Sequence, residues 1–259
     1  MKKIKNLFIH DYFQNYGGGE RLILSLIKKE DTLLTAFISK DLKKIVKNKK
    51  KIILQNNRKL SFKIKKLLSP LSFYLYKTKN IYRNILVSGN YSVFLDLPLK
   101  SNKIFYCHSL PKIFFEFEKF YNKNNLILRV FIFCTKNIFK YFYIKKINIF
   151  DKVIVNSNYT KLKLKKYYKK KIYIIYPPIQ NYRTNKKNID SKKIFFLSNN
   201  RHEIEKNIDI IIKVFNKINN FNLIILSNGS QTKKLKKLAR NNNRIKFLGL
   251  VKEKIYKKL

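Results

Sequence analysis

Short apolar runs alternate along this chain with longer stretches of helical periodicity. Residues 4–10 form an apolar cluster typical of a short buried strand, and apolar residues recur at helical spacing over residues 22–27. Gly17, Gly18 and Gly19 lie between these two segments. The N-terminal part of the chain is therefore predicted to fold as a strand, a glycine turn and a helix.

The same alternation continues through both halves of the chain. In the first half we predict strands at residues 32–39, 85–87, 91–95, 103–108, 151–157 and 171–178, a polar connection with a short helix at 41–51, and helices at 58–79, 112–121, 126–147 and 159–168. Residues 180–193 are polar and without periodicity, which is typical of a linker. Beyond them we predict strands at 193–198, 221–227 and 244–251 and helices at 206–218, 231–240 and 253–259.

Strands that alternate with helices predict parallel sheets with helical crossover connections. The fold class is therefore predicted to be α/β with two Rossmann-like domains. Residues 1–180 would form the first domain, 181–192 the linker, and 193–259 the second domain. Because the second domain holds only three predicted strands, we expect it to be truncated.

The chain has 259 residues, is 45% hydrophobic and carries a net charge of +45. A charge of this size would favour nucleic acid or an anionic membrane as a partner. However, only eight of the 59 basic residues are arginine, so much of the charge is equally compatible with a compositional bias towards lysine on a solvated surface. Neither an aromatic RNA-binding signature nor a helix-turn-helix pattern is present, and we expect no nucleic-acid partner.

Two segments combine apolar and basic residues in a way that favours a membrane surface. In residues 58–79, one helical stripe is apolar while the lysines lie elsewhere and Pro70 bends the run; residues 131–143 are aromatic and flanked by lysine. The alternative is that these faces pack inside the first domain. No signal peptide and no run of about 18 uncharged residues is found, and the two cysteines suit a reducing compartment. We therefore expect a cytoplasmic protein, peripheral on the inner face of the membrane.

Three groups of residues are candidates for a functional site. Gly17, Gly18 and Gly19 would let a helix N-terminus approach an anion such as phosphate, although they could equally serve only to close a tight turn. His108 ends a predicted strand, where open α/β sheets bind ligands, although the position taken alone favours a hydrogen-bonded histidine in a partly buried loop. Arg201 and Lys206 flank the loop that leads into a predicted helix, where cations are easier to explain if an anion binds nearby. The stronger alternative is ordinary surface charge, because almost a quarter of all residues are basic.

Taken together, these segments resemble GT-B glycosyltransferases of the large retaining group called family 4. GGGER is similar to the family's Gly-Gly-x-Glu-Arg turn, YCHSLPKIF to its Tyr-Cys-His-Ser-Pro-Pro-Arg segment, VIVNSNYTKLKLKKYY to its Asn-Ser segment, IIYPPI to its Tyr-Pro-Pro-Val hinge, and NNRHEIEKNID to its Arg-x-x-x-x-Lys-Asn loop. The chain departs from the family at Leu110, where a proline is usual, and in lacking the family's C-terminal region.

The resemblance implies transfer of a sugar, with retention, from a nucleotide diphosphate-sugar to a glycan or lipid-linked acceptor, with the donor bound in the cleft between the two domains. GDP-mannose is among the donors it suggests. Arg201 and Lys206 would neutralise the departing diphosphate, Gly17, Gly18 and Gly19 would close on it, and His108 would contact the transferred sugar. No Asp-x-Asp motif is present, and neither a metal nor another cofactor is expected.

The family's two late glutamates, which hold the sugar and the ribose, would lie beyond residue 259. The alternative to an active transferase is therefore a truncated or split, non-catalytic fragment that needs a partner chain encoded downstream. We expect from this that the 259-residue chain is not a competent transferase by itself.

Overall fold

A computed structural model describes residues 6–56, 60–78, 80–116, 126–178 and 195–251. The chain divides into two compact units, Met1–Gln180 and Asn181–Leu259, each of which is described below by itself. The predicted linker and the predicted helix at 253–259 lie outside the described residues.

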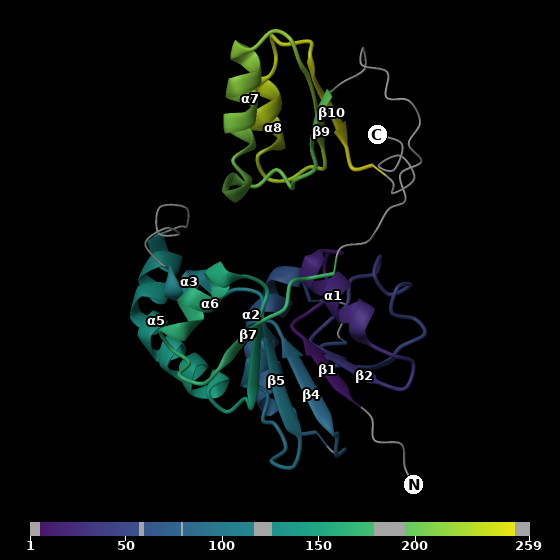
Figure 1. The fold of residues 1–259 in the computed structure, drawn as a ribbon, viewed down its shortest axis with the longest axis vertical. Helices are drawn as coiled ribbons and strands as arrows, with labels where there is room; N and C mark the ends of the chain where they lie inside the picture. The colour runs from purple at the N-terminus through teal and green to yellow at the C-terminus, as the bar shows by residue number, and fades with distance from the viewer. Residues whose placement is uncertain (1–5, 57–59, 79, 117–125, 179–194, 252–259) are drawn as a thin grey trace. The chain divides into compact units, whose positions relative to one another are not determined.

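Unit 1 is built on a seven-stranded parallel sheet (Figure 1). Its strands are β1 (Leu7–His10), β2 (Thr32–Thr35), β3 (Lys50–Ile53), β4 (Asn84–Ser88), β5 (Asn102–Cys107), β6 (Lys152–Val155) and β7 (Ile172–Ile174). They are arranged in the order β3-β2-β1-β4-β5-β6-β7, so the sheet is built outward in one direction from β1 and in the other from β4. The position between β1 and β4 is a topological switch point, where open α/β sheets form a crevice at the carboxyl ends of the strands.

Helices and short turns connect these strands. They are α1 (Gly18–Leu26), α2 (Phe62–Leu75), the 3-10 turn η1 (Ser92–Phe94), α3 (Lys112–Phe115), α5 (Leu126–Ile147) and α6 (Asn158–Lys165). Alternate residues of one strand enter different cores: Leu7 and Ile9 belong to the larger core with side chains of α2, α5 and α6, whereas Phe8 packs with Ile23 of α1. The apolar runs of the strands are continuous because the sheet is buried on both faces.

Helix α2 turns its apolar face towards solvent, whereas an amphipathic helix usually buries that face. Its buried residues are Lys65, Ser69 and Phe73, spaced one turn apart. Leu67 and Leu75, on the apolar stripe seen in the sequence, are 76% and 67% exposed. The sequence pattern correctly predicts an apolar stripe on a helix, but in this structure the stripe faces outward rather than into the domain.

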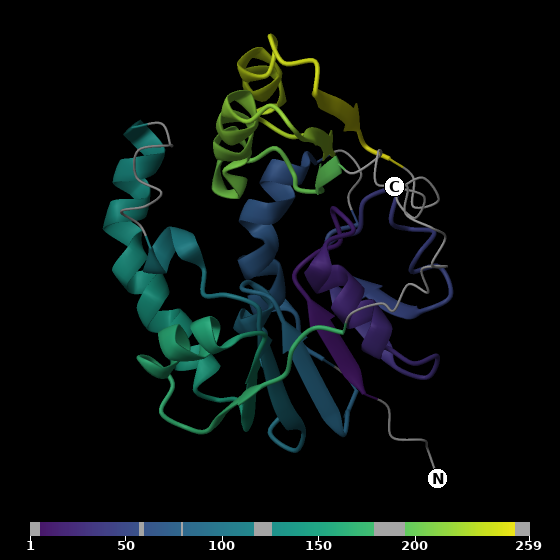
Figure 2. The same cartoon turned by 45° about the horizontal axis from the view of Figure 1, so that its top comes forward.

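Unit 2 holds a three-stranded parallel sheet in the order β10-β9-β8. Its elements are β8 (Phe195–Ser198), the 3-10 turn η3 (Ile204–Lys206), α7 (Ile208–Lys217), β9 (Asn222–Leu226), α8 (Thr232–Leu238) and β10 (Ile245–Gly249). The core joins side chains of α7 and α8 to the sheet, with Ile212 and Ile225 completely buried. Both helices lie on the same side of the three strands (Figure 2). The described part of unit 2 is therefore an α/β layer of the same kind as unit 1.

Three local predictions are wrong. Residues 91–95 form the 3-10 turn η1 rather than a strand, because the backbone N–H groups that open this turn are bonded to the carboxylate of Asp11. The connection predicted at 41–51 gives way at its end to the strand β3, residues 50–53. This strand begins with two lysines, which are tolerated because β3 lies at the edge of the sheet and pairs only with β2. The helix predicted from residue 206 begins at Ile208, because Asn207 takes up a left-handed conformation (φ 50°).

The orientation of α2 can be tested by stability measurements. Replacing the completely buried Phe73 with alanine should lower the free energy of unfolding by about 3–5 kcal/mol, because the substitution leaves a cavity in the larger core. Leu71→Ala, on the exposed face of the same helix, is the matched control and should change it by less than about 1 kcal/mol. Urea unfolding followed by circular dichroism measures both. A larger effect for Leu71→Ala than for Phe73→Ala would contradict this orientation.

Candidate functional site

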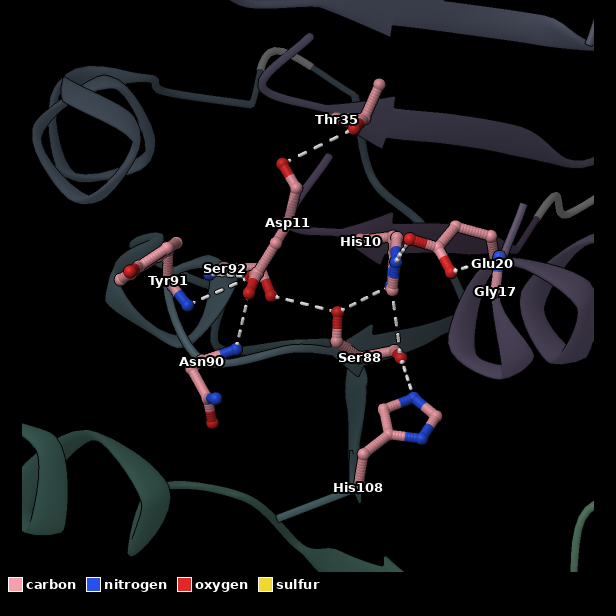
Figure 3. A network of polar contacts seen from close by, with 10 residues as sticks. All are labelled: His10, Asp11, Gly17, Glu20, Thr35, Ser88, Asn90, Tyr91, Ser92 and His108. Atoms are coloured by element: carbon pink, nitrogen blue, oxygen red, sulfur yellow. Dashed lines mark hydrogen bonds and ion pairs between the residues drawn. The ribbon is translucent and has the colours of Figure 1, made fainter. Parts of the chain in front are cut away.

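The carboxyl ends of three neighbouring strands bring together His10, Ser88 and His108 (Figure 3). His10 ends β1, Ser88 ends β4, and His108 directly follows β5. The Nδ1 atom of His10 lies 3.0 Å from the carbonyl oxygen of Ser88, and the Ser88 hydroxyl lies 2.8 Å from Nε2 of His108. These three side chains therefore form one connected group at the topological switch point of the sheet.

The environment of His108 keeps its imidazole neutral. Burial, followed by the nearby His10, lowers the pKa of His108 to about 4, although Glu20 acts in the opposite direction. A neutral imidazole has one nitrogen that accepts and one that donates a hydrogen bond. Because the Ser88 hydroxyl can donate to Nε2 of His108, this arrangement leaves the Nδ1–H of His108 as a donor towards a ligand.

The glycines open helix α1 directly against these two histidines. Gly17 is the N-cap residue, and Gly18 and Gly19 are the first residues of the helix. None of the three has a positive φ angle, so they are not required for an unusual backbone turn. A Cβ atom at Gly19 would instead lie 3.5 Å from His10 and 3.5 Å from Nε2 of His108. These are ordinary van der Waals distances, so the helix N-terminus packs closely on both imidazoles but the position does not require glycine.

Glu20 links the helix N-terminus to His10. Its carboxylate accepts a hydrogen bond of 3.1 Å from the backbone N–H of Gly17, and it lies 4.0 Å from Nε2 of His10. Burial alone would raise the pKa of Glu20, but His10 and the backbone N–H groups outweigh burial and lower it. The first turn of α1 therefore holds a carboxylate that is ionised at neutral pH.

Asp11 fixes the loop that follows β4. Its carboxylate accepts hydrogen bonds from the backbone N–H groups of Asn90, Tyr91 and Ser92, at 2.7, 2.9 and 2.8 Å. Gly89 adopts a φ of +127°, and a Cβ atom there would lie 2.3 Å from the Asp11 side chain. This position requires glycine both for its backbone conformation and for the close approach of Asp11.

Arg201 and Lys206 lie on one loop of unit 2, after β8. Both side chains are exposed. Lys206 ends the turn η3, and α7 begins two residues later at Ile208. The sequence predicted a helix from residue 206, which would place Lys206 in its first turn. In the structure Lys206 instead lies in the turn immediately before α7.

Polar contacts of His202 and Glu203 hold this loop in place. His202, between the sheet and the loop, contacts the Thr232 hydroxyl through Nδ1 at 2.9 Å and the Leu226 carbonyl through Nε2 at 3.1 Å. The carboxylate of Glu203 accepts a 2.7 Å hydrogen bond from the Ser230 hydroxyl. The backbone that carries Arg201 is thus anchored to the start of α8.

Among the residues that the structure describes, no three His, Cys, Asp or Glu side chains gather in a way that could hold a metal ion. No helix in the described part of the chain is both long and apolar enough to cross a membrane.

Comparison with solved structures identifies the architecture. The chain is similar to HepE of Anabaena, solved in complex with UDP and glucose, with a TM-score of 0.64 and 13% identity over 96% of this chain and 70% of HepE. It is also similar to the lipopolysaccharide outer core galactosyltransferase WaaB (TM-score 0.62, 15% identity, 98% of this chain and 70% of WaaB) and to TarM (0.59, 12%, 98% and 78%). These neighbours are GT-B glycosyltransferases. The chain has the GT-B fold. No protein-family model and no curated protein sequence matches it.

Within unit 1 of this GT-B chain, the structure places Gly19 beside His108. Gly17 and Gly18 precede Gly19 at the start of the same helix, and neither has His108 among its nearest neighbours. Arg201 and Lys206 share one loop of the second unit.

The sequence did not single out four residues that surround His108 and the glycines in unit 1. They are His10, Asp11, Glu20 and Ser88. The available signals were a polar residue at the end of each apolar run and the glutamate within GGGER.

The depressed pKa of His108 makes folding depend on pH. As the pH falls from about 6.5 to about 4, the unfolded chain protonates His108 while the folded side chain remains neutral, so the free energy of unfolding should fall. The contribution of this one group is about 3 kcal/mol at most, is fully present above pH 6.5, and is lost towards pH 4.

Urea unfolding of the wild type and of His108→Gln at pH 7, 6 and 5 measures this contribution. Glutamine does not titrate, so the variant should lose less stability than the wild type over this range. An equal loss in both proteins would contradict the lowered pKa of His108.

Proposed function

We propose that this chain is a glycosyltransferase that moves a sugar, with retention, from a nucleotide diphosphate-sugar to a glycan or lipid-linked acceptor. The observation that supports this proposal most strongly is the GT-B likeness over 96% of the chain to HepE, a protein solved with UDP and glucose bound. UDP-sugars and GDP-mannose are the donors to test first. The anomeric configuration of the product, read by NMR, tests retention.

In this proposal Arg201 and Lys206 bind the diphosphate of the donor. Negative charge grows on the diphosphate as the glycosidic bond breaks, so fixed cations stabilise the transition state more than the ground state. The backbone N–H groups at Gly17, Gly18 and Gly19 would add hydrogen-bond donors at the positive end of α1. The N–H of Gly17 already donates to the carboxylate of Glu20. The N–H groups of Gly18 and Gly19 would therefore be the principal donors of this group.

His108 would contact the transferred sugar. Its imidazole is neutral at pH 7, because its pKa is lowered to about 4, and its Nδ1–H can donate to a sugar hydroxyl without adding a positive charge. A neutral group suits this position, because positive charge develops on the sugar ring during transfer. We propose that the two cationic side chains replace a divalent ion, so activity should persist in EDTA.

The diphosphate contact is tested by Lys206→Ala. A charged hydrogen bond contributes about 1.5–3 kcal/mol, so this variant should lower kcat/KM by roughly tenfold or more and weaken binding of UDP or GDP similarly. Isothermal titration with the nucleotide and a transfer assay with radiolabelled donor measure the two effects. Lys217→Ala, at the far end of α7, is the matched control and should leave both unchanged. If Lys206→Ala and Lys217→Ala had the same kcat/KM and the same nucleotide affinity, Lys206 would be an ordinary surface charge and not a diphosphate contact.

We further propose that unit 1 binds an anionic membrane surface through α2. This helix exposes a row of apolar side chains, including Leu67, Leu71 and Leu75, beside the exposed Lys63. Helix α5 likewise exposes Phe133 among its lysines. Apolar side chains can enter the headgroup region while each lysine near an anionic leaflet adds about 1 kcal/mol. This surface would bring the enzyme to a lipid-linked acceptor.

Replacing Leu67 and Leu71 together with serine should reduce sedimentation with vesicles that contain 30% anionic lipid by roughly tenfold or more, because two exposed apolar contacts are removed. Cosedimentation at low and high salt is the measurement, and the wild type should bind less as salt rises. The matched control is Ile210→Ser, an exposed apolar residue on α7 of unit 2. Wild-type binding that is independent of both anionic lipid and salt would contradict the proposal.

A further inference from the structure

Ser88 lies between two imidazoles at the switch point of the unit 1 sheet (Figure 3). Its side chain is completely buried, and its Oγ atom lies 3.3 Å from Nδ1 of His10 and 2.8 Å from Nε2 of His108. A hydroxyl carries one hydrogen, so it can donate to only one of these two nitrogens. The direction in which Ser88 donates therefore decides where the ring hydrogens of both histidines lie.

The carbonyl oxygen of Ser88 defines the state of His10. Nδ1 of His10 lies 3.0 Å from this oxygen, which can only accept a hydrogen bond. Nδ1 of His10 therefore carries a hydrogen whether the ring is neutral or protonated. Glu20 lies on the other side of the ring, 4.0 Å from Nε2 of His10, so its carboxylate does not compete for the hydrogen on Nδ1. His10 consequently acts as a donor towards Ser88.

The hydrogen of the Ser88 hydroxyl then has one acceptor left. Because Nδ1 of His10 is protonated, only Nε2 of His108 can accept this hydrogen among the residues that the structure describes. A hydrogen on Nε2 of His108 would instead place two donors against the Ser88 oxygen and leave the hydroxyl hydrogen without an acceptor there. A buried polar group without a partner lowers stability. The hydrogen bonds therefore run in one direction, from His10 to Ser88 and from Ser88 to His108.

This direction fixes the tautomer of His108. Burial keeps its imidazole neutral at pH 7, so the ring carries a single hydrogen, and that hydrogen must lie on Nδ1. The tautomer of a neutral histidine is set by the hydrogen bond that its other nitrogen makes. Figure 3 shows no contact between the second ring nitrogen of His108 and the residues drawn. That nitrogen is thus the one available to a ligand.

The same hydrogen bond defines which way the ring of His108 faces. Turning the imidazole over would put a C–H group against the Ser88 hydroxyl in place of Nε2, and the hydroxyl would again lose its acceptor. The rings of Tyr106 and His10, centred 5.0 and 6.4 Å from that of His108, pack beside it in either orientation. Aromatic packing therefore does not distinguish the two orientations, whereas the contact with Ser88 does.

We propose that Ser88 is a positioning residue. Its hydroxyl holds His108 in the Nδ1–H form, so that His108 offers a hydrogen-bond donor, and not an acceptor, to an oxygen atom of a ligand. Ser88 itself is completely buried, so it acts through His108 alone. The identity of that ligand as the transferred sugar rests on the proposed transferase function, whereas the tautomer does not.

¹⁵N NMR of the histidine rings, on the full chain at pH 7, tests the tautomer, because protonated and unprotonated ring nitrogens have well-separated chemical shifts. The chain contains only three histidines, and the variants His108→Gln and His202→Gln assign two of them directly. His202 is an internal reference, since its Nε2 lies 3.1 Å from the Leu226 carbonyl oxygen and must carry a hydrogen. His108 should show the opposite pattern, with a hydrogen on Nδ1 and none on Nε2.

Ser88→Ala removes the hydroxyl from which Nε2 of His108 accepts. The Nε2–H form of His108 should then become populated, so the shift of Nε2 should move towards that of a protonated nitrogen and the shift of Nδ1 away from it. Ser101→Ala is the matched control, because the Ser101 hydroxyl is also buried and donates to the Tyr82 carbonyl at 2.6 Å, at the opposite end of β5 from His108. This variant should leave both shifts of His108 unchanged.

In a transfer assay, Ser88→Ala should lower kcat/KM by roughly tenfold or more, because the donor on His108 is no longer fixed, and Ser101→Ala should not. A hydrogen on Nε2 of wild-type His108, an unchanged pattern in Ser88→Ala, an equal change in Ser101→Ala, or transfer by Ser88→Ala at the wild-type rate would overturn the inference. The expected tautomer in a wild type that transfers no sugar would keep the role of Ser88 and refute the proposed function instead.

Discussion

The carboxylate of Asp11 connects the parts of unit 1 on which its candidate sites depend. Its three hydrogen bonds to the loop after β4 fix the ends of the two central strands at the switch point of the sheet. His10 precedes Asp11 and contacts Ser88, and Gln14, three residues after Asp11, lines a cavity at the same edge of the sheet. Hydrogen bonds from backbone N–H groups to a carboxylate are stronger than those between neutral groups. The part-buried carboxylate of Asp11 thus positions residues on both sides of it in the chain.

Helix α1 combines two features that act in opposite directions on an anion. At Gly19 the helix N-terminus packs closely on His108, which favours an anion beside it, whereas the carboxylate of Glu20 already neutralises part of the helix dipole. In the absence of a bound anion, Glu20 satisfies an N–H group that would otherwise be unpaired. An anion that binds there must therefore compete with a carboxylate held by the protein itself.

The alternation of strands and helices made most of the fold predictable. Parallel strands buried on both faces appear in the sequence as continuous apolar runs, and helix α5 has the bounds that its periodicity gave, residues 126–147. The strand β3 escaped prediction because it begins with Lys50 and Lys51, which an edge position tolerates. The prediction of a strand at 91–95 was wrong because Asp11, which is distant in sequence, accepts hydrogen bonds from the backbone N–H groups that open this segment and so stabilises a turn.

The candidate site was less predictable for the same physical reason. His108 could be found because it ends an apolar run, but its contact with Ser88 depends on which strands are neighbours, and the strand order is not written in any local pattern. Periodicity also identified the apolar stripe of α2 without telling which way it faces. The buried face of that helix is marked by Phe73 together with a lysine and a serine, a combination that hydrophobicity alone assigns to solvent.

The outward-facing leucines of α2 also bear on the colloidal behaviour of the protein. A net charge of +45 makes two copies repel each other, and this repulsion opposes association through exposed apolar rows. The range of that repulsion shrinks from about 10 Å in 0.1 M salt to about 3 Å in 1 M salt. Ionic strength therefore sets how strongly charge opposes association through the apolar row of α2, and dilute buffers favour the dispersed chain.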